Sequence, residues 1–280
     1  VKILMTKIFK NFKIKILTAI FFGGVLVLLN YRVVIKQSFE DWNRVRKLPK
    51  AISVEASTSS VLEISNTEKL NSGDSNGKKV EKKISEVKNQ LPAEINLKVP
   101  FVLQAPNALW DALHEDACEE ASVIMFNAFF KKKTGFTKQE MEDAIQKVVA
   151  WEKNKFGFFE DTTVEETVQI LKEYFGLTGV KAVYDITIDD IKKELAAGRP
   201  VIVPAAGKLL FNPNFRGGGP PYHMLVIKGY TKNGYFITND PGTKRGADYI
   251  YKIDVLYKAI HDWVPGGNVL DGRKAMIVVR

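Results

Sequence analysis

One cysteine and three histidines are the residues of this chain that can supply a nucleophile and a base near neutral pH. The cysteine is Cys118, and the histidines are His114, His223 and His261. A single cysteine excludes an internal disulfide and a zinc cluster built from several thiolates. Cys118 is therefore either a small buried hydrophobic residue or a nucleophile, and its sequence context has to decide between them.

Cys118 lies where the sequence predicts the first turn of a helix. Asp116 and Glu119 have the spacing of a capping box, and an apolar run follows over residues 121–130. The unpaired backbone N–H groups and the positive dipole end of a helix start favour a thiolate. Asp116, Glu119 and Glu120 would instead raise the thiol pKa if they faced the sulfur. A nucleophilic thiol also needs a base beside it.

His223 is the candidate for that base. It opens a predicted strand directly after the Gly/Pro-rich segment 216–222. An Asn-Gly turn at residues 233–234 predicts a hairpin, which brings Asn239 and Asp240 back beside His223. A side-chain oxygen there would accept from the imidazole and fix its tautomer. The sequence thus pairs His223 with Asp240 or Asn239; the alternative is that His223 only opens a strand and Asp240 only starts a turn.

Metal and cofactor sites are not expected. His114 and Cys118 are spaced i, i+4, but no further ligand completes a metal set and the segment is not a His-Glu-x-x-His motif. His261 is predicted to cap or pack at the end of a short helix. The glycine run at residues 217–219 is followed by prolines rather than a helix, so it is not a phosphate-binding loop.

The elements that must position these residues are predicted to form an α+β fold. Three capping boxes begin at Thr137, Thr163 and Thr187, each with an acidic residue three positions later. Because the helices come first and the sheet later, a wound parallel sheet is not expected. The predicted helices are 121–130, 137–154, 163–176 and 187–198, the predicted strands are 201–205, 223–230, 235–238, 249–253 and 275–279, and an extended edge segment covers 97–104.

The net charge of +9 comes from the N-terminal part of the chain. Residues 1–50 contain 11 Lys and Arg against 2 Asp and Glu, and residues 51–280 contain 30 of each sign. A nucleic-acid-binding domain would place its basic surface on the folded part, so no nucleic-acid partner is expected. The excess of Lys and Arg instead flanks an apolar run, as it does in membrane proteins.

That run predicts a membrane anchor. Residues 1–15 contain five lysines and no acid, and residues 16–35 are long enough to cross a bilayer. No small-x-small cleavage site follows the run, which favours an uncleaved signal anchor over a signal peptide. The basic N-terminus then stays in the cytoplasm and the C-terminal domain lies outside it. Residues 36–95 are predicted to be a linker, disordered from about residue 51, and residues 96–280 the folded domain.

Three segments in order resemble the C39-like peptidase family of the papain-like cysteine peptidase group. They are Val99-Pro100-Phe101-Val102-Leu103-Gln104, the helix start Ala117-Cys118-Glu119-Glu120-Ala121-Ser122-Val123-Ile124-Met125, and His223-Met224-Leu225-Val226-Ile227-Lys228-Gly229-Tyr230 followed by Asn239-Asp240-Pro241-Gly242. The resemblance implies a papain-like fold, with Cys118 at the start of a helix packed on an antiparallel sheet that carries His223 and Asp240. It also implies that Gln104 donates to the oxyanion.

The resemblance implies a thiol peptidase acting on a peptide or protein. Cys118 attacks a carbonyl, His223 protonates the leaving amine, and Gln104 with the Cys118 backbone N–H stabilises the oxyanion. Glu119 departs from the family, where glycine often follows the cysteine, and the interval between Gln104 and Cys118 is long. Two alternatives stay open: another amide hydrolase or acyl transferase acting on cell-wall peptides, and a catalytically silent domain that binds peptides or a partner. The segment 207–222 is predicted to be a substrate-facing flap, and oligomeric state is left open.

Overall fold

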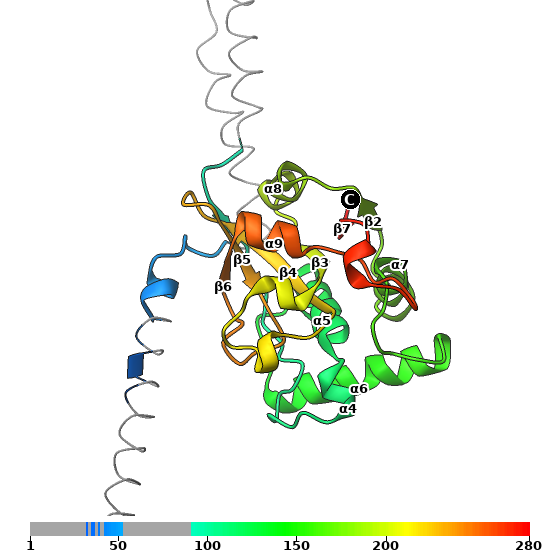
Figure 1. Cartoon of the computed structure of the whole chain (residues 1–280). Helices are drawn as coiled ribbons and strands as arrows, with labels where there is room; N and C mark the ends of the chain where they lie inside the picture. The colour runs from blue at the N-terminus through cyan, green and yellow to red at the C-terminus, as the bar shows by residue number, and fades with distance from the viewer. Residues whose placement is uncertain (1–31, 33–34, 37–38, 40–41, 53–90) are drawn as a thin grey trace, which may run out of the picture. The chain divides into compact units, whose positions relative to one another are not determined.

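The computed structural model describes residues 32, 35–36, 39, 42–52 and 91–280 (Figure 1). The chain divides into two units, Val1–Leu48 and Pro49–Arg280. In the first unit, Phe39 stacks on Trp42, and Arg46 lies over the Trp42 ring. Within the described residues, no helix combines the length and the apolar composition needed to cross a membrane. The predicted anchor over residues 16–35 lies almost entirely outside these residues and stays a prediction.

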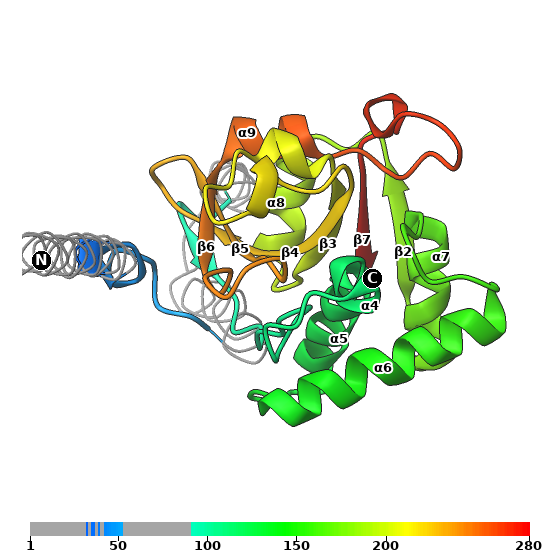
Figure 2. The ribbon, with the colours of Figure 1, turned by 60° about the horizontal axis from the view of Figure 1, so that its bottom comes forward.

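The second unit is built on an antiparallel sheet, as the α+β prediction requires. Its strands follow the order β2-β7-β3-β4-β5-β6, and β1 pairs with β4 beside this path. Every pairing between these strands is antiparallel, and Figure 2 shows β3 to β6 side by side. The strands are β1 Ile95–Asn96, β2 Val180–Tyr184, β3 Val201–Ala205, β4 His223–Tyr230, β5 Tyr235–Asn239, β6 Tyr249–Lys252 and β7 Ala275–Val279.

The central strands β3 and β4 are buried along their whole length, because helices cover the sheet. α5 packs on β3 and β4, α7 on β2 and β7, and α9 on β5 and β6; Figure 2 shows α6 running along the outside of α5. The helices are α4 Ala112–Glu115, α5 Cys118–Phe130, α6 Lys138–Lys155, α7 Val164–Gln169, α8 Ile188–Ala196 and α9 Ile253–Ala259, with a π-helical turn at Ile170–Tyr174 and 3₁₀ turns at Gly207–Leu210, Arg216–Gly218 and Val269–Asp271.

Three of the four predicted capping boxes are confirmed. Thr137, Thr163 and Thr187 each accept from the backbone three residues on, and the acidic residue there accepts from the threonine N–H. The box at Asp116 is wrong. α5 begins after Ala117 without a side-chain cap, Asp116 ends α4, and the Glu119 carboxyl is used elsewhere.

Two other sequence predictions need correction at the edges of the sheet. Residues 97–104 form no strand beyond a single bridge from Leu97 to Ile52, and the strand proper is Ile95–Asn96. Ile253, predicted to end a strand, begins α9. Inside the predicted linker, the Pro49 carbonyl accepts from Asn96, so the folded unit includes residues from that segment.

Candidate active site

Cys118 is the first residue of α5 and is almost completely buried. Its thiol donates to Glu119 Oε2, with 2.9 Å between the sulfur and the oxygen. Burial raises the pKa of the Cys118 thiol well above its ordinary value, and the adjacent Glu119 carboxyl raises it further. Burial and the Glu119 carboxyl thus outweigh the helix start, which by itself favours a thiolate. Of the two possibilities that the sequence left open, the structure has Glu119 facing the sulfur.

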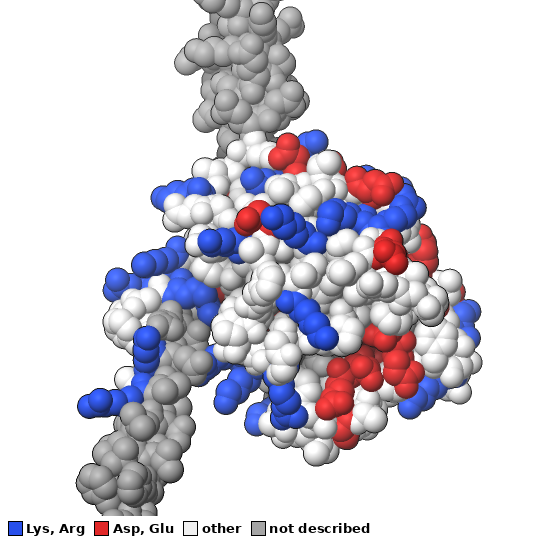
Figure 3. All heavy atoms as spheres, viewed as in Figure 1, with Lys and Arg blue, Asp and Glu red and all other residues white. Residues whose placement is uncertain are grey.

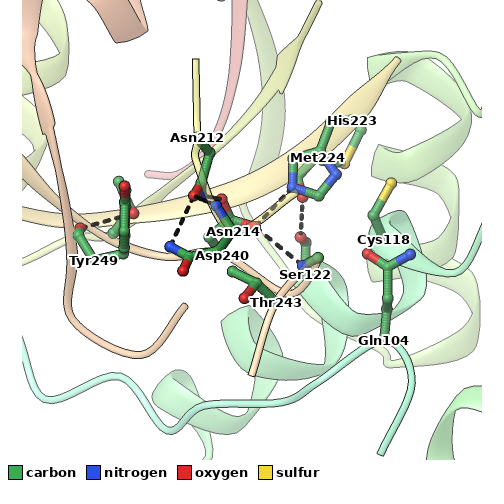
Figure 4. A network of polar contacts seen from close by, with 12 residues as sticks. Gln104, Cys118, Ser122, Asn212, Asn214, His223, Met224, Asp240, Thr243 and Tyr249 are labelled. Atoms are coloured by element: carbon green, nitrogen blue, oxygen red, sulfur yellow. Dashed lines mark hydrogen bonds and ion pairs between the residues drawn. The ribbon is translucent and has the colours of Figure 1, made fainter. Parts of the chain in front are cut away.

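His223 begins β4 and lies in a buried position against Asp240. Its Nε2 is 2.9 Å from Asp240 Oδ1. Figure 4 shows the imidazole between Asp240 and Cys118, with its second ring nitrogen on the cysteine side. Sequence reasoning left Asp240 and Asn239 open. The Asn239 amide instead donates to the Val99 and Pro100 carbonyls, which ties the segment 99–104 to the sheet.

Asp240 is fully buried and accepts from several donors at once. The Gly242 N–H donates to Oδ1, while the Tyr251 hydroxyl and the Asn212 amide donate to Oδ2. Burial alone would raise the pKa of Asp240, but the nearby His223 and these hydrogen bonds offset it and leave the pKa below its usual value. Asp240 is therefore held as a carboxylate that can orient the His223 ring.

Asn212 and Tyr251 are site residues that sequence reasoning missed. Asn212 Nδ2 also donates to the Tyr251 hydroxyl at 2.7 Å, so the two side chains support the same carboxylate oxygen. They lie 28 and 11 residues from Asp240 in sequence. Neither sits in a motif, and no signal in one sequence connects residues that meet only through the packed sheet.

Gln104 lies in the site, but its amide nitrogen donates to backbone carbonyls and is not free for the expected oxyanion role. Nε2 donates to the His114 carbonyl at 2.9 Å and the Glu115 carbonyl at 3.1 Å. Oε1 is buried and has no hydrogen-bond partner in the described part of the chain. Two carbonyl acceptors fix the orientation of the amide, because only the NH₂ end can donate to them. Oxyanion donation from Gln104 requires this amide to rotate or release one carbonyl.

The two remaining histidines have other partners. His114 Nδ1 is 2.7 Å from Asp111 and Nε2 is 3.1 Å from Glu142, so its ring joins α4 to α6. His261 Nδ1 is 2.8 Å from the Gly272 carbonyl, a hydrogen bond between the segment after α9 and the turn before β7.

A pocket of about 650 Å³ opens beside His223 and Gln104. The predicted flap forms much of its wall, and the Phe215 ring meets the His223 ring edge-on with 5.2 Å between the centroids. Cys118 is not among the residues that line the pocket. The lining residues are Gln104, Trp110, Glu115, Asp116, Lys208, Asn214, Phe215, Arg216, Gly217, Gly219, Pro220, Pro221, His223 and Gly242.

Several solved structures match parts of this chain. A Bacillus anthracis protein assigned as a C39-like peptidase has a TM-score of 0.43 at 16% identity, with 67% of this chain and 98% of that one covered. A mutant prointerpain A fragment of Prevotella intermedia has a TM-score of 0.34 at 18% identity, with 50% and 41% covered. Active interpain A cysteine protease of the same organism has a TM-score of 0.33 at 20% identity, with 51% and 57% covered.

No curated protein matches the chain. The sequence does match the model of the Peptidase_C39 like family over residues 96–269, which is more than half of the chain. This segment contains the helix start with Cys118, the strand with His223 and the turn with Asp240. The chain belongs to the C39-like peptidase family and is a cysteine peptidase.

Proposed function

We propose that this peptidase cleaves peptide bonds with Cys118 as nucleophile, His223 as general base and acid, and Asp240 as the group that orients His223. The observation that carries the proposal is the 2.9 Å contact between His223 Nε2 and Asp240. It leaves Nδ1 as the ring nitrogen on the side of the Cys118 sulfur (Figure 4). A base held in one tautomer beside a helix-start thiol is the arrangement that thiol catalysis needs.

The reaction proceeds by acyl transfer to water. The Cys118 proton passes to His223, and the sulfur attacks the substrate carbonyl. His223 then gives its proton to the leaving amine and takes one from the water that hydrolyses the thioester. The Cys118 backbone N–H stabilises the oxyanion, and Gln104 joins it once its amide turns from the His114 and Glu115 carbonyls.

The charges around the pocket suggest which peptides it accepts. Glu115 and Asp116 lie on the wall at the end of α4, and Lys208 and Arg216 on the flap. Figure 3 shows acidic side chains gathered near α4 on the face of the molecule that is turned to the viewer. Opposite charges on two walls favour a peptide with charged groups of both signs near the cleaved bond.

Membrane attachment is a separate part of the proposal. The lysine-rich residues 1–15 and the apolar segment 16–35 support a single-pass anchor with the peptidase outside the cytoplasm. Protease added to intact cells should digest the folded domain if this topology is correct. Protection of the domain in intact cells and digestion only after lysis would contradict it.

The peptidase proposal is tested by digesting a peptide library and purified cell-wall peptides with the wild type and with Cys118→Ala. We expect the wild type to hydrolyse library peptides and the variant to hydrolyse none. Exclusive cleavage of the cell-wall peptides would move the activity to that substrate class. Equal hydrolysis by Cys118→Ala would overturn the assignment of the nucleophile.

A further inference from the structure

Glu119, the residue directly after the nucleophile, is buried against the Cys118 sulfur. One carboxyl oxygen accepts from the thiol at 2.9 Å, and the other accepts from the Thr162 N–H at 3.2 Å. Thr162 is itself completely buried, and its carbonyl accepts from the Tyr222 hydroxyl at 2.9 Å. Both carboxyl oxygens of Glu119 thus have a hydrogen-bond donor, and one of them faces the Cys118 sulfur.

The groups around Glu119 are mainly acidic. Glu120 on the same helix and Asp161 before α7 raise its pKa. Glu119 in turn raises the pKa values of Glu152 on α6 and of Tyr222 just before β4. Burial raises the pKa of Glu119 well above its ordinary value, and the charges of Glu120 and Asp161 raise it further. Glu119 therefore keeps its proton to a higher pH than an exposed glutamate does.

The contact between Glu119 and the sulfur has opposite consequences in the two protonation states. A neutral carboxyl carries an O–H that can donate to a thiolate. An ionised carboxyl only accepts, so it keeps the hydrogen on the sulfur and repels a negative charge there. The effect acts at hydrogen-bond distance in a dry environment, where such interactions are strongest.

We propose that Glu119 is a positioning residue whose proton controls whether Cys118 can ionise. With its proton in place, Glu119 donates to the thiolate that forms when the sulfur proton moves to His223. Without its proton, Glu119 holds the thiol neutral and turned from the base. The inference rests on the proposed role of Cys118 and adds a limit to the catalytic activity at high pH.

The test is the rate of iodoacetamide alkylation of Cys118 in the full chain, measured from pH 6 to pH 9 for wild type and Glu119→Gln. The amide keeps the size of the side chain, can donate to the thiolate and accept from Thr162, and does not titrate. We expect similar rates at pH 6 and a ratio of variant to wild type that grows with pH, reaching about tenfold if the thiol pKa falls by one unit. A ratio of rates that is constant from pH 6 to pH 9 would overturn the proposal, because a purely structural effect of the substitution does not change with pH.

Glu120→Gln is the matched control. It changes a buried glutamate of the same helix turn that does not touch the sulfur. We expect a smaller rise in the alkylation rate than in Glu119→Gln, because Glu120 raises the pKa of the Cys118 thiol less than Glu119 does. An equal rise in this variant would show that general acidity, and not the contact at Glu119, controls the thiol, and would also overturn the proposal.

Two further measurements keep the outcomes separate. If Glu119→Gln fails to fold, the wild-type profile decides alone. The alkylation rate must rise in two steps with a plateau between them, because ionisation of Glu119 suppresses ionisation of the thiol until the second proton leaves. A profile with a single step contradicts the proposal. His223→Ala in the same assay tests the proposed function independently. An unchanged alkylation rate in His223→Ala would disprove the proposed Cys118–His223 pair. The comparison of Glu119→Gln with wild type would still be valid.

Discussion

At the scale of single residues, the chemistry depends on how many donors converge on Asp240. Its two oxygens accept from His223, Gly242, Tyr251 and Asn212. An amide in its place offers one acceptor atom and turns an NH₂ group towards donors. The carboxylate is therefore required by its whole set of partners and not by His223 alone.

Replacement of Asp240 by Asn should lower kcat/KM by about 10²-fold or more, because the imidazole loses its orienting charge. Tyr251→Phe, which removes one donor and keeps the carboxylate, should have a much smaller effect. Steady-state kinetics on one peptide substrate checks both. Equal losses in the two variants would contradict a special role for the charge.

The Asp240→Asn substitution also changes how the stability of the protein depends on pH. The pKa of Asp240 is lowered in the folded protein, so its contribution is present above the unfolded value near 4 and is lost as the pH falls through the folded value. We expect the difference in unfolding free energy between wild type and Asp240→Asn to shrink on acidification. Urea unfolding at pH 7 and at pH 3 measures it, and a difference that widens at pH 3 would have the wrong sign.

At the scale of elements, α5 and α6 meet through two buried acids, Glu120 and Glu152. In the described structure their carboxyl oxygens have no donor. Burial, together with the charges of Glu119, Glu166 and Glu160, raises the pKa of Glu152 to about 8. Burial and the neighbouring Glu152 carboxyl raise the pKa of Glu120 well above its ordinary value. The pair is therefore satisfied only while a proton is shared between the carboxyl groups.

This pair should make stability fall as the pH rises from about 5 to 8, because the unfolded chain releases protons that the folded pair retains. Glu152→Gln should flatten that fall and raise Tm at pH 8, by about 2–4 °C for each kcal/mol gained. Thermal unfolding at several pH values checks it. Glu140→Gln, on the exposed start of the same helix, is the control: the pKa of Glu140 is lowered to about 2, so it stays ionised throughout this range.

The contact between the flap and the turn after β5 gives a prediction about geometry. A Cβ at Gly242 would lie 2.9 Å from the Phe215 ring and 3.0 Å from the His223 ring. Gly242→Ala should therefore displace His223 and lower kcat by about 10²-fold. Gly135→Ala, where a Cβ meets nothing within 4 Å, should leave kcat unchanged. Wild-type kcat in Gly242→Ala would show that the flap and His223 do not need this close fit.

Local patterns in the sequence predicted elements more reliably than they predicted the contacts between them. Thr137, Thr163 and Thr187 cap their helices because both partners of each box lie within one turn. The box at Asp116 failed because Glu119 bonds to Cys118 and, 43 residues on, to Thr162. The role of Tyr251 and the amide orientation of Gln104 likewise depend on tertiary contacts, which one sequence does not encode as spacing.

At the scale of the whole molecule, the basic charge and the peptidase belong to different parts of the chain. Residues 49–280 form a unit with its own core, and the sequence-predicted anchor precedes it. We expect the full chain to pellet with membranes and to be released by detergent but not by high salt. A chain starting at Pro49 should stay in the supernatant and keep peptidase activity. Release of the full chain by salt alone would contradict an inserted anchor.

The central claim is that Cys118 reacts because His223 takes its proton. The direct measurement is intact-mass analysis of the full chain after reaction with a peptide-based thiol-reactive probe, for wild type, His223→Ala and Cys118→Ala. The account predicts one probe per wild-type chain, slow labelling of His223→Ala and none of Cys118→Ala. Labelling of His223→Ala at the wild-type rate would contradict it.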